Sequence, residues 1–230
     1  MNPIGIIHSP YQEKFAIPRQ PGLVPSAIGR IDFYSPYNQA ECFRGLEEFS
    51  HLWVQFIFHE TQAKGWKPLV RPPRLGGNEK RGVFATRSTF RPNAIGLSVV
   101  KIEAINEHKG TVALSVSGID LLDQTPILDI KPYIAYSDAL PKAISGFAQE
   151  SPSSDLKVEF SECAREALST QAKHFPYLYK LIEEVLAQDP RPAYHTNQNE
   201  DRVYGMALYD FNIKWRVISN VAYVVELEHR

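Results

Sequence analysis

The feature that most constrains the fold is a series of short apolar stretches, separated by turns, over the first 140 residues. Apolar and polar residues alternate at 29–33, 95–103 and 111–116, and 52–58 is almost continuously apolar. Alternation indicates half-buried strands, and the apolar run indicates a central strand or one buried on both faces. Together with 4–7 and the segment that follows the Asp-rich turn near 120–125, they make six or seven short strands with little helix. The sequence therefore predicts a mainly β fold with a closed or nearly closed β-barrel.

A second, smaller unit is predicted after the barrel. The composition shifts to Ser, Pro, Ala and Gly near residue 140, and helical periodicity appears at 162–173 and 177–187. Alternating strands are expected at 209–217 and 221–227. We predict a barrel domain at 1–138, a linker at 139–157 and a small α+β domain at 158–230. Some 70 residues barely suffice for an independent core, so this domain is expected to dock on the barrel or on a second subunit.

Several classes of protein are disfavoured. The chain has no apolar run of about 20 residues and no signal peptide, so we expect a cytoplasmic protein without a membrane anchor. Cys42 and Cys163 lie far apart and fit neither a disulfide framework nor a metal site, and we expect no metal. No GxGxxG follows the first strand, which disfavours a Rossmann domain.

A short helix is expected at 36–43, with Cys42 on its buried side.

A strongly basic stretch interrupts an otherwise nearly neutral chain, whose formal net charge is −1. Between residues 64 and 91 a single carboxylate, Glu79, stands against these cations: Lys64, Lys67, Arg71, Arg74, Lys80, Arg81, Arg87 and Arg91. Such an excess attracts anionic partners, with phosphate and nucleic acid first among them. Two turns, at 76–78 and 91–93, flank residues 83–86, which we expect to form a strand. A solvated basic loop pair without a ligand is the alternative.

Three further segments carry residues suited to a site. The proline-rich loop 11–25 contains Pro18, Arg19 and Gln20, and proline stiffening lowers the entropy lost when a ligand binds. His59 and Glu60 end the apolar strand, where ionisable groups are candidates for chemistry. The turn after residue 119 contains Asp120, Asp123, Gln124 and Thr125, whose polar groups could bind a ligand or simply form the turn.

The longest motifs carry a family resemblance. They are IGIIHSPY (4–11), PRQPGL (18–23), RGLEEFSHLWV (44–54), RPPRLGG (71–77), GVFATRSTFRPNAIGLS (82–98), DLLDQTPILDIKPY (120–133), LAQDPRPAY (186–194) and DFNIKWRV (210–217). In these segments the chain resembles the TsaA/TrmO family of S-adenosylmethionine-dependent tRNA methyltransferases, over almost its full length. Ala94 departs from the second proline usual after Asn93.

The resemblance implies methyl transfer from S-adenosylmethionine to N6 of a threonylcarbamoyladenosine beside the tRNA anticodon. It also implies a homodimer, with the cofactor in a pocket at the barrel end. Carried over residue by residue, the cofactor contacts are Pro18, Arg19, Gln20, His59, Glu60, Arg87, Leu97, Leu122, Asp123, Gln124 and Thr125.

The chemistry of these residues fits such roles. Arg87 is suited to clamp the cofactor carboxylate, or alternatively an RNA phosphate. Asp120 or Asp123 could take the cofactor ammonium or the ribose hydroxyls, and His59 or Glu60 is the candidate proton acceptor. The predicted RNA contacts are Lys64, Lys67, Arg71, Arg74, Lys80, Arg81 and Arg91, with Trp66 or Phe90 available to stack a base in the anticodon loop.

The C-terminal segment 189–192 and the polar face with Lys214 and Arg216 are weaker candidates for contacts to tRNA. Two other functions remain open from the sequence. One is a non-enzymatic RNA- or nucleotide-binding barrel, and the other is a methyltransferase acting on a small molecule or a protein.

Overall fold

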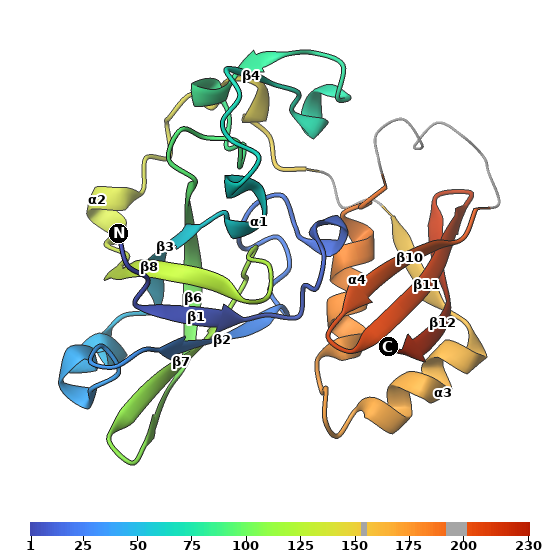
Figure 1. The fold of residues 1–230 in the computed structure, drawn as a ribbon. Helices are drawn as coiled ribbons and strands as arrows, with labels where there is room; N and C mark the ends of the chain where they lie inside the picture. Colours follow the sequence, from blue (N-terminus) through green and yellow to red (C-terminus); the bar gives the residue numbers. More distant parts are fainter. Residues whose placement is uncertain (153–155, 192–201) are drawn as a thin grey trace.

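Six antiparallel strands close into a barrel in the N-terminal part of the chain (Figure 1). The computed structural model describes residues 1–152, 156–191 and 202–230. The barrel order is β1-β2-β7-β6-β3-β8. Its strands are β1 (Gly5–His8), β2 (Ile28–Phe33), β3 (His51–Ile57), β6 (Ile95–His108), β7 (Thr111–Ser117) and β8 (Thr125–Pro132). The predicted mainly β barrel is confirmed, and each strand lies where an apolar stretch had indicated one.

The inward positions of β3 show why these residues form a barrel. Leu52, Val54 and Phe56 are buried in the core, while the residues between them are half-buried on the outer face. Pairing of β3 with both β6 and β8 satisfies the backbone of this apolar run. Gly96 of β6 lies opposite Phe56, and a Cβ there would come within 2.3 Å of the aromatic ring. The ring therefore fills space that any larger residue at position 96 would need.

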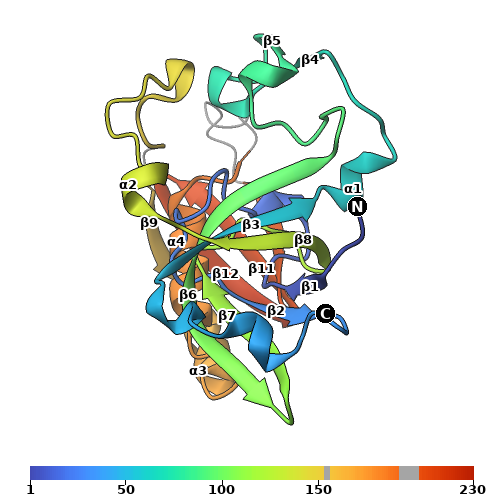
Figure 2. The ribbon, with the colours of Figure 1, turned by 90° about the vertical axis from the view of Figure 1, so that its left-hand side faces the viewer.

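One end of the barrel gathers three loops. Because neighbouring strands are antiparallel, β1, β7 and β3 finish at the end where β2, β6 and β8 begin. The loops there span 9–27, 58–94 and 118–124, and the longest of them carries α1 (His59–Gln62), β4 (Leu69–Val70) and β5 (Arg81–Gly82). Figure 2 shows β4 and β5 standing above the barrel, on the side opposite α3.

Two local predictions are wrong. Residues 83–86 form no strand: Val83–Ala85 is a 3-10 turn, and the ladder is made instead by Leu69–Val70 with Arg81–Gly82. Near residue 40 the chain forms only the 3-10 turn Ala40–Phe43, in which Phe43 is buried and Cys42 is exposed. In both places the turn is too short to bury one face of a strand or helix, and a single buried side chain, Val83 or Phe43, holds it against the core. The further 3-10 turns are Lys14–Ala16, Leu46–Glu48, Pro73–Leu75 and Gly146–Ala148.

The C-terminal part folds around its own four-stranded sheet, of order β10-β11-β12-β9. After the short α2 (Ala135–Asp138), its elements are β9 (Lys157–Phe160), α3 (Glu162–Gln171), α4 (Leu178–Ala187), β10 (Tyr204–Leu208), β11 (Phe211–Ile218) and β12 (Val221–His229). Ser161 caps α3 by accepting a hydrogen bond from the Ala164 amide. The sequence indicated α3, α4, β11 and β12 but not β9 or β10, and β9 pairs in parallel with β12.

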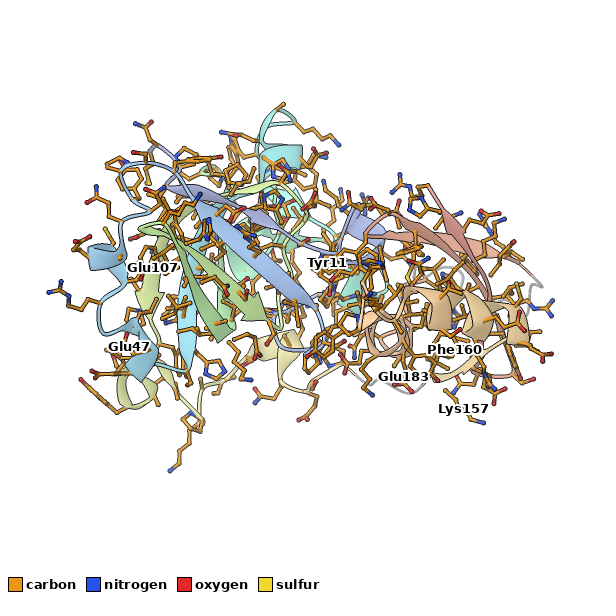
Figure 3. The ribbon with its side chains drawn as sticks, turned by 90° about the horizontal axis from the view of Figure 1, so that it is seen from below. Tyr11, Glu47, Glu107, Lys157, Phe160 and Glu183 are labelled. Carbon is orange, nitrogen blue, oxygen red and sulfur yellow. The ribbon has the colours of Figure 1, made fainter. Side chains whose placement is uncertain are left out.

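The sheet domain packs against the loop end of the barrel, and one hydrophobic core runs through both. Tyr11, fully buried, forms an isolated bridge with Leu208 of β10 and lies at the junction of the two parts in Figure 3. Within the described residues, no helix is long and apolar enough to cross a membrane.

Candidate cofactor and RNA site

All the predicted cofactor contacts lie at the loop end of the barrel. Pro18, Arg19 and Gln20 belong to loop 9–27, Arg87 to loop 58–94, and Leu97 to the beginning of β6. His59 and Glu60 open α1, and residues 122–125 lead into β8. The topology thus brings segments more than 100 residues apart to one rim.

Four polar side chains on this rim form two hydrogen-bonded pairs. The Arg87 guanidinium donates a hydrogen bond to the Gln20 side-chain oxygen at 2.5 Å, and the Ser98 hydroxyl donates to Asp120 at 2.6 Å. Burial raises the pKa of Asp120 from 3.8 to about 6, although the Ser98 hydrogen bond, a backbone hydrogen bond and the nearby positive charge of Arg87 lower it. A half-buried carboxylate and an exposed guanidinium therefore lie near each other at the barrel mouth.

The loop from Leu122 to Thr125 is held by its own polar groups. Asp123 accepts a hydrogen bond from the backbone amide of Ser9 at 2.8 Å. The side-chain Nε2 of Gln124 donates to Nδ1 of the His8 ring at 2.9 Å. The Thr125 hydroxyl donates to the Leu122 carbonyl at 2.7 Å. Asp123 is thus engaged in fixing the first strand, which leaves Asp120 as the better of the two aspartates for a cationic ligand group.

A cavity of about 350 Å³ lies beside this loop, between the barrel and the β10–β11 turn. Asp123 is its sole lining residue among the predicted cofactor contacts, and Tyr209 and Asp210 contribute from the C-terminal domain. Neither Arg87 nor Asp120 lines it. Because complementary charges converge at Arg87 and Asp120, we place the candidate cofactor site there and treat the cavity as a neighbouring groove.

The remaining predicted contacts differ in accessibility. Pro18 is buried, whereas Arg19 is exposed. The Leu97 side chain is 51% exposed, which leaves an apolar surface free for a ring to cover. His59 Nε2 lies 3.8 Å from Glu60 Oε1, and the Glu60 side chain is largely exposed. Neither residue forms an ion pair or side-chain hydrogen bond with the Arg87 group in the described structure.

The basic stretch divides into engaged and unengaged cations. Arg91 donates to the backbone carbonyls of Val83 and Thr86, at 3.3 and 2.8 Å, and so secures the 3-10 turn between them. Arg81 forms an ion pair with Glu79 at 2.5 Å, and Arg74 donates to the Glu150 carbonyl of the linker. In the part of the chain that the structure describes, no ion pair involves Lys64, Arg71 or Lys80. These three cations are the most available to phosphates.

The aromatic residues of this stretch differ in how exposed their rings are. Lys67 Nζ lies 4.4 Å from the centre of the half-buried Phe90 ring, so both side chains are engaged with each other. Trp66 is 56% exposed and fits a stacking role better. Sequence reasoning missed Phe84, which is 77% exposed on the turn secured by Arg91. Residues 83–86 were expected to form a strand, and in a strand this ring would pack against a sheet. It was therefore not considered as an exposed RNA contact.

The weaker C-terminal candidates are mostly engaged within their own domain. Arg191 is almost fully buried and makes two hydrogen bonds of 2.7 Å to the carboxylate of Asp189. Lys214 pairs with Glu226 at 3.3 Å and also with Glu228. Pro192 lies outside the described residues. Arg191 and Lys214 are therefore not free contacts for RNA phosphate, and Arg216 is half-buried.

The rim carries chemical groups that suit a zwitterionic ligand beside an anionic polymer. A guanidinium makes paired hydrogen bonds to a carboxylate, a buried carboxylate attracts an ammonium, and exposed Leu97 offers apolar contact. The amino-acid part and the ring of S-adenosylmethionine require these three features. The side chains at this rim fit that cofactor.

Comparison with known proteins shows the family of this chain. The family model described as "tRNA-methyltransferase O N-terminal domain" matches residues 6–139, and "TrmO C-terminal domain" matches residues 153–230. A tRNA (adenine(37)-N6)-methyltransferase of Escherichia coli is 52% identical over 227 residues, which cover 99% of this chain and 97% of that protein. A putative S-adenosylmethionine-dependent methyltransferase of Pseudomonas aeruginosa is 47% identical, covering 94% and 91%.

A solved structure shows the same fold. The crystal structure of TrmO from P. aeruginosa superposes with a TM-score of 0.81 at 42% identity, covering 98% of this chain and 95% of that one. Two family models, together spanning nearly the whole sequence, and relatives of this identity lead to one conclusion. The chain belongs to the tRNA-methyltransferase O family.

Proposed function

We propose that this protein transfers a methyl group from S-adenosylmethionine to N6 of an adenosine in tRNA. The observation that carries the proposal is the presence, at the loop end of a barrel, of the hydrogen-bonded Arg87–Gln20 pair and of Asp120, whose raised pKa is lowered in part by the charge of Arg87. The Escherichia coli relative whose name states this activity matches 99% of the chain. Within this activity we propose threonylcarbamoyladenosine next to the anticodon as the substrate.

The cofactor supplies a methyl group on a sulfonium, and the protein contributes mainly position and charge. Arg87 would pair with its carboxylate and Asp120 with its ammonium. Gln20 holds the Arg87 guanidinium in place, and Leu97 would pack against the adenine. The other proposed lining residues are Pro18, Arg19, His59, Glu60, Leu122, Asp123, Gln124 and Thr125.

The acceptor nitrogen carries a proton that must leave. Its lone pair is delocalised into the ring and the urea carbonyl, so removal of that proton increases its nucleophilicity. We propose His59 or Glu60 as the acceptor, since both lie at the mouth of the barrel on α1. Loss of the acceptor should lower kcat, whereas loss of Asp120 should raise the KM for the cofactor.

The anticodon loop would lie across loop 58–94. Bases in single-stranded loops are unstacked and can be read by stacking on aromatic rings. Lys64, Arg71 and Lys80 would contact phosphates, and Trp66 and Phe84 offer exposed rings close to them in sequence. Arg74, Arg81, Arg91 and Lys67 would contribute mainly to the shape and potential of this surface.

We further propose a cytoplasmic homodimer built from a catalytic barrel (1–138), a linker (139–157) and the C-terminal domain (158–230). The linker region exposes large apolar side chains, among them Tyr136, Leu140 and Ile144. Exposed apolar surface of this kind is typical of protein contacts. Sedimentation analysis of the wild-type chain tests the dimer.

Transfer of labelled methyl from S-adenosylmethionine to tRNA tests the proposed function. The tRNA should come from cells that lack this protein, with a parallel sample that also lacks the threonylcarbamoyl group. We expect label on the complete tRNA alone. Label on neither, despite cofactor binding, would favour a small-molecule or protein substrate, and tRNA binding without cofactor binding would favour a non-enzymatic barrel.

A further inference from the structure

The loop between Tyr11 and Ser26 is fastened to the C-terminal domain at both of its ends. At the first end the Tyr209 amide donates to the Pro10 carbonyl at 2.8 Å, and the Glu13 carboxylate accepts from the Ala207 amide at 2.9 Å. Phe15 follows, with its ring centre 6.5 Å from that of Trp215, a fully buried residue of β11. This end of the loop is therefore bound by the C-terminal sheet.

The second end is bound by a single carboxylate of α4. Oε2 of Glu184 accepts two hydrogen bonds from Ser26, at 2.9 Å from its amide and 2.7 Å from its hydroxyl. Ser26 is only 9% exposed, so both donors would lose most of their hydration without this partner. Figure 1 shows α4 on the side of the C-terminal domain that faces the barrel.

The segment between these attachments carries three of the proposed cofactor contacts, Pro18 to Gln20. Gln20 accepts the hydrogen bond from Arg87, which connects this loop to loop 58–94. The barrel itself contributes two backbone attachments, from the Gly22 amide to the Gly118 carbonyl and from the Asp123 amide to the Tyr11 carbonyl, both at 2.8 Å. The other attachments described above come from the C-terminal domain.

We propose that the C-terminal domain holds the cofactor loop in its binding shape, and that Glu184 is a positioning residue for the cofactor site. It acts through Ser26 on the loop that presents Gln20 to Arg87. A preordered loop binds with a smaller loss of entropy, so removal of the attachment should weaken cofactor binding without altering the chemical step. This inference rests on the proposed function for the identity of the ligand.

Glu184→Ala is the test variant, and Glu183→Ala is its matched control. Glu183 is the preceding residue of α4 and pairs with Lys180 on the surface at 2.7 Å; Figure 3 shows it away from the junction. Glu184→Gln keeps an oxygen that can accept hydrogen bonds from both Ser26 donors. Its KM for S-adenosylmethionine should therefore stay within about threefold of the wild type. Ser26→Ala removes only the hydrogen bond from the Ser26 hydroxyl to Glu184, and it replaces Glu184→Ala as the test variant if that protein fails to fold.

Two measurements are made on each full-length variant: amide hydrogen exchange of residues 12–25 without cofactor, and the KM and kcat for S-adenosylmethionine. For Glu184→Ala we expect faster exchange in this loop and a KM raised about tenfold, with kcat within about twofold of the wild type. Binding of tRNA should not change.

Unchanged exchange, or faster exchange with an unchanged KM, would overturn the inference, as would equal effects in Glu183→Ala. Failure of the wild type to bind S-adenosylmethionine would instead refute the proposed function. The exchange measurement would then still decide whether Glu184 orders the loop.

Discussion

Replacing Asp120 with Asn should make the protein more stable and worse at binding its cofactor. Burial raises the pKa of Asp120 from 3.8 to about 6, so the folded state carries a carboxylate that would be better solvated in the unfolded chain. At 1.36 kcal/mol per pKa unit, the charge costs about 3 kcal/mol of folding free energy at neutral pH. Asn removes the charge and retains an oxygen that can accept from Ser98.

The sign of the pH dependence follows from the raised pKa. Below pH 3.8 the carboxyl is protonated in both states and costs nothing, and above pH 6 it is ionised in both and the full cost applies. The gain from Asp120→Asn should therefore approach about 3 kcal/mol at pH 7.5 and fall to about 1 kcal/mol near pH 4.5. Urea unfolding at these two pH values measures it.

Asp129→Asn is the control, because Asp129 is an exposed carboxylate of β8. Its substitution should change the unfolding free energy by less than about 0.5 kcal/mol at either pH. Cofactor affinity should fall in Asp120→Asn and not in Asp129→Asn. Equal stability of Asp120→Asn and wild type at pH 7.5, or a gain that does not shrink toward pH 4.5, would refute the reasoning.

Three further results are expected. Arg71→Ala and Lys80→Ala should each lower the slope of log K for tRNA against log salt by about 1, while Lys157→Ala on the C-terminal sheet should not, as binding titrations can show. His59→Ala should lower the rate constant of single-turnover methylation at saturating cofactor by about 10²–10⁴-fold if His59 accepts the proton; an unchanged rate constant would remove it from that role. Gly96→Ala should destabilise the barrel by about 1–3 kcal/mol in thermal unfolding, because its Cβ would overlap the Phe56 ring; wild-type stability would contradict this packing argument.

The barrel could be predicted because its signal is local. Alternation in 29–33 and 111–116 identifies strands directly, and antiparallel neighbours need only turns such as Lys109–Gly110 between them. The strands β9 and β10 were missed because each is short, and β9 pairs in parallel with β12, some 60 residues away in the sequence. The sequence of β9 carries no sign of that partner.

The candidate site was predicted from the sequence mainly through the family resemblance, which indicated Arg87 and the loops beside it as cofactor contacts. The sequence does not show which groups surround each side chain or which hydrogen bonds it makes. Asp120 and Asp123 are the same residue type, yet desolvation raises the pKa of Asp120 and Asp123 accepts a hydrogen bond from the Ser9 amide. Likewise, only the structure distinguishes Arg91, bound to backbone carbonyls, from Lys80, which forms no ion pair within the described residues.

The most direct test of the account is a calorimetric titration of S-adenosylmethionine into the wild-type protein, Arg87→Ala and Arg81→Ala. Both variants lose one positive charge from the same loop, but only Arg87 belongs to the group with Gln20 and Asp120. The account predicts binding by the wild type and Arg81→Ala, and a loss of at least about tenfold in affinity for Arg87→Ala. Equal binding by all three proteins would show that the cofactor lies elsewhere and would contradict the account.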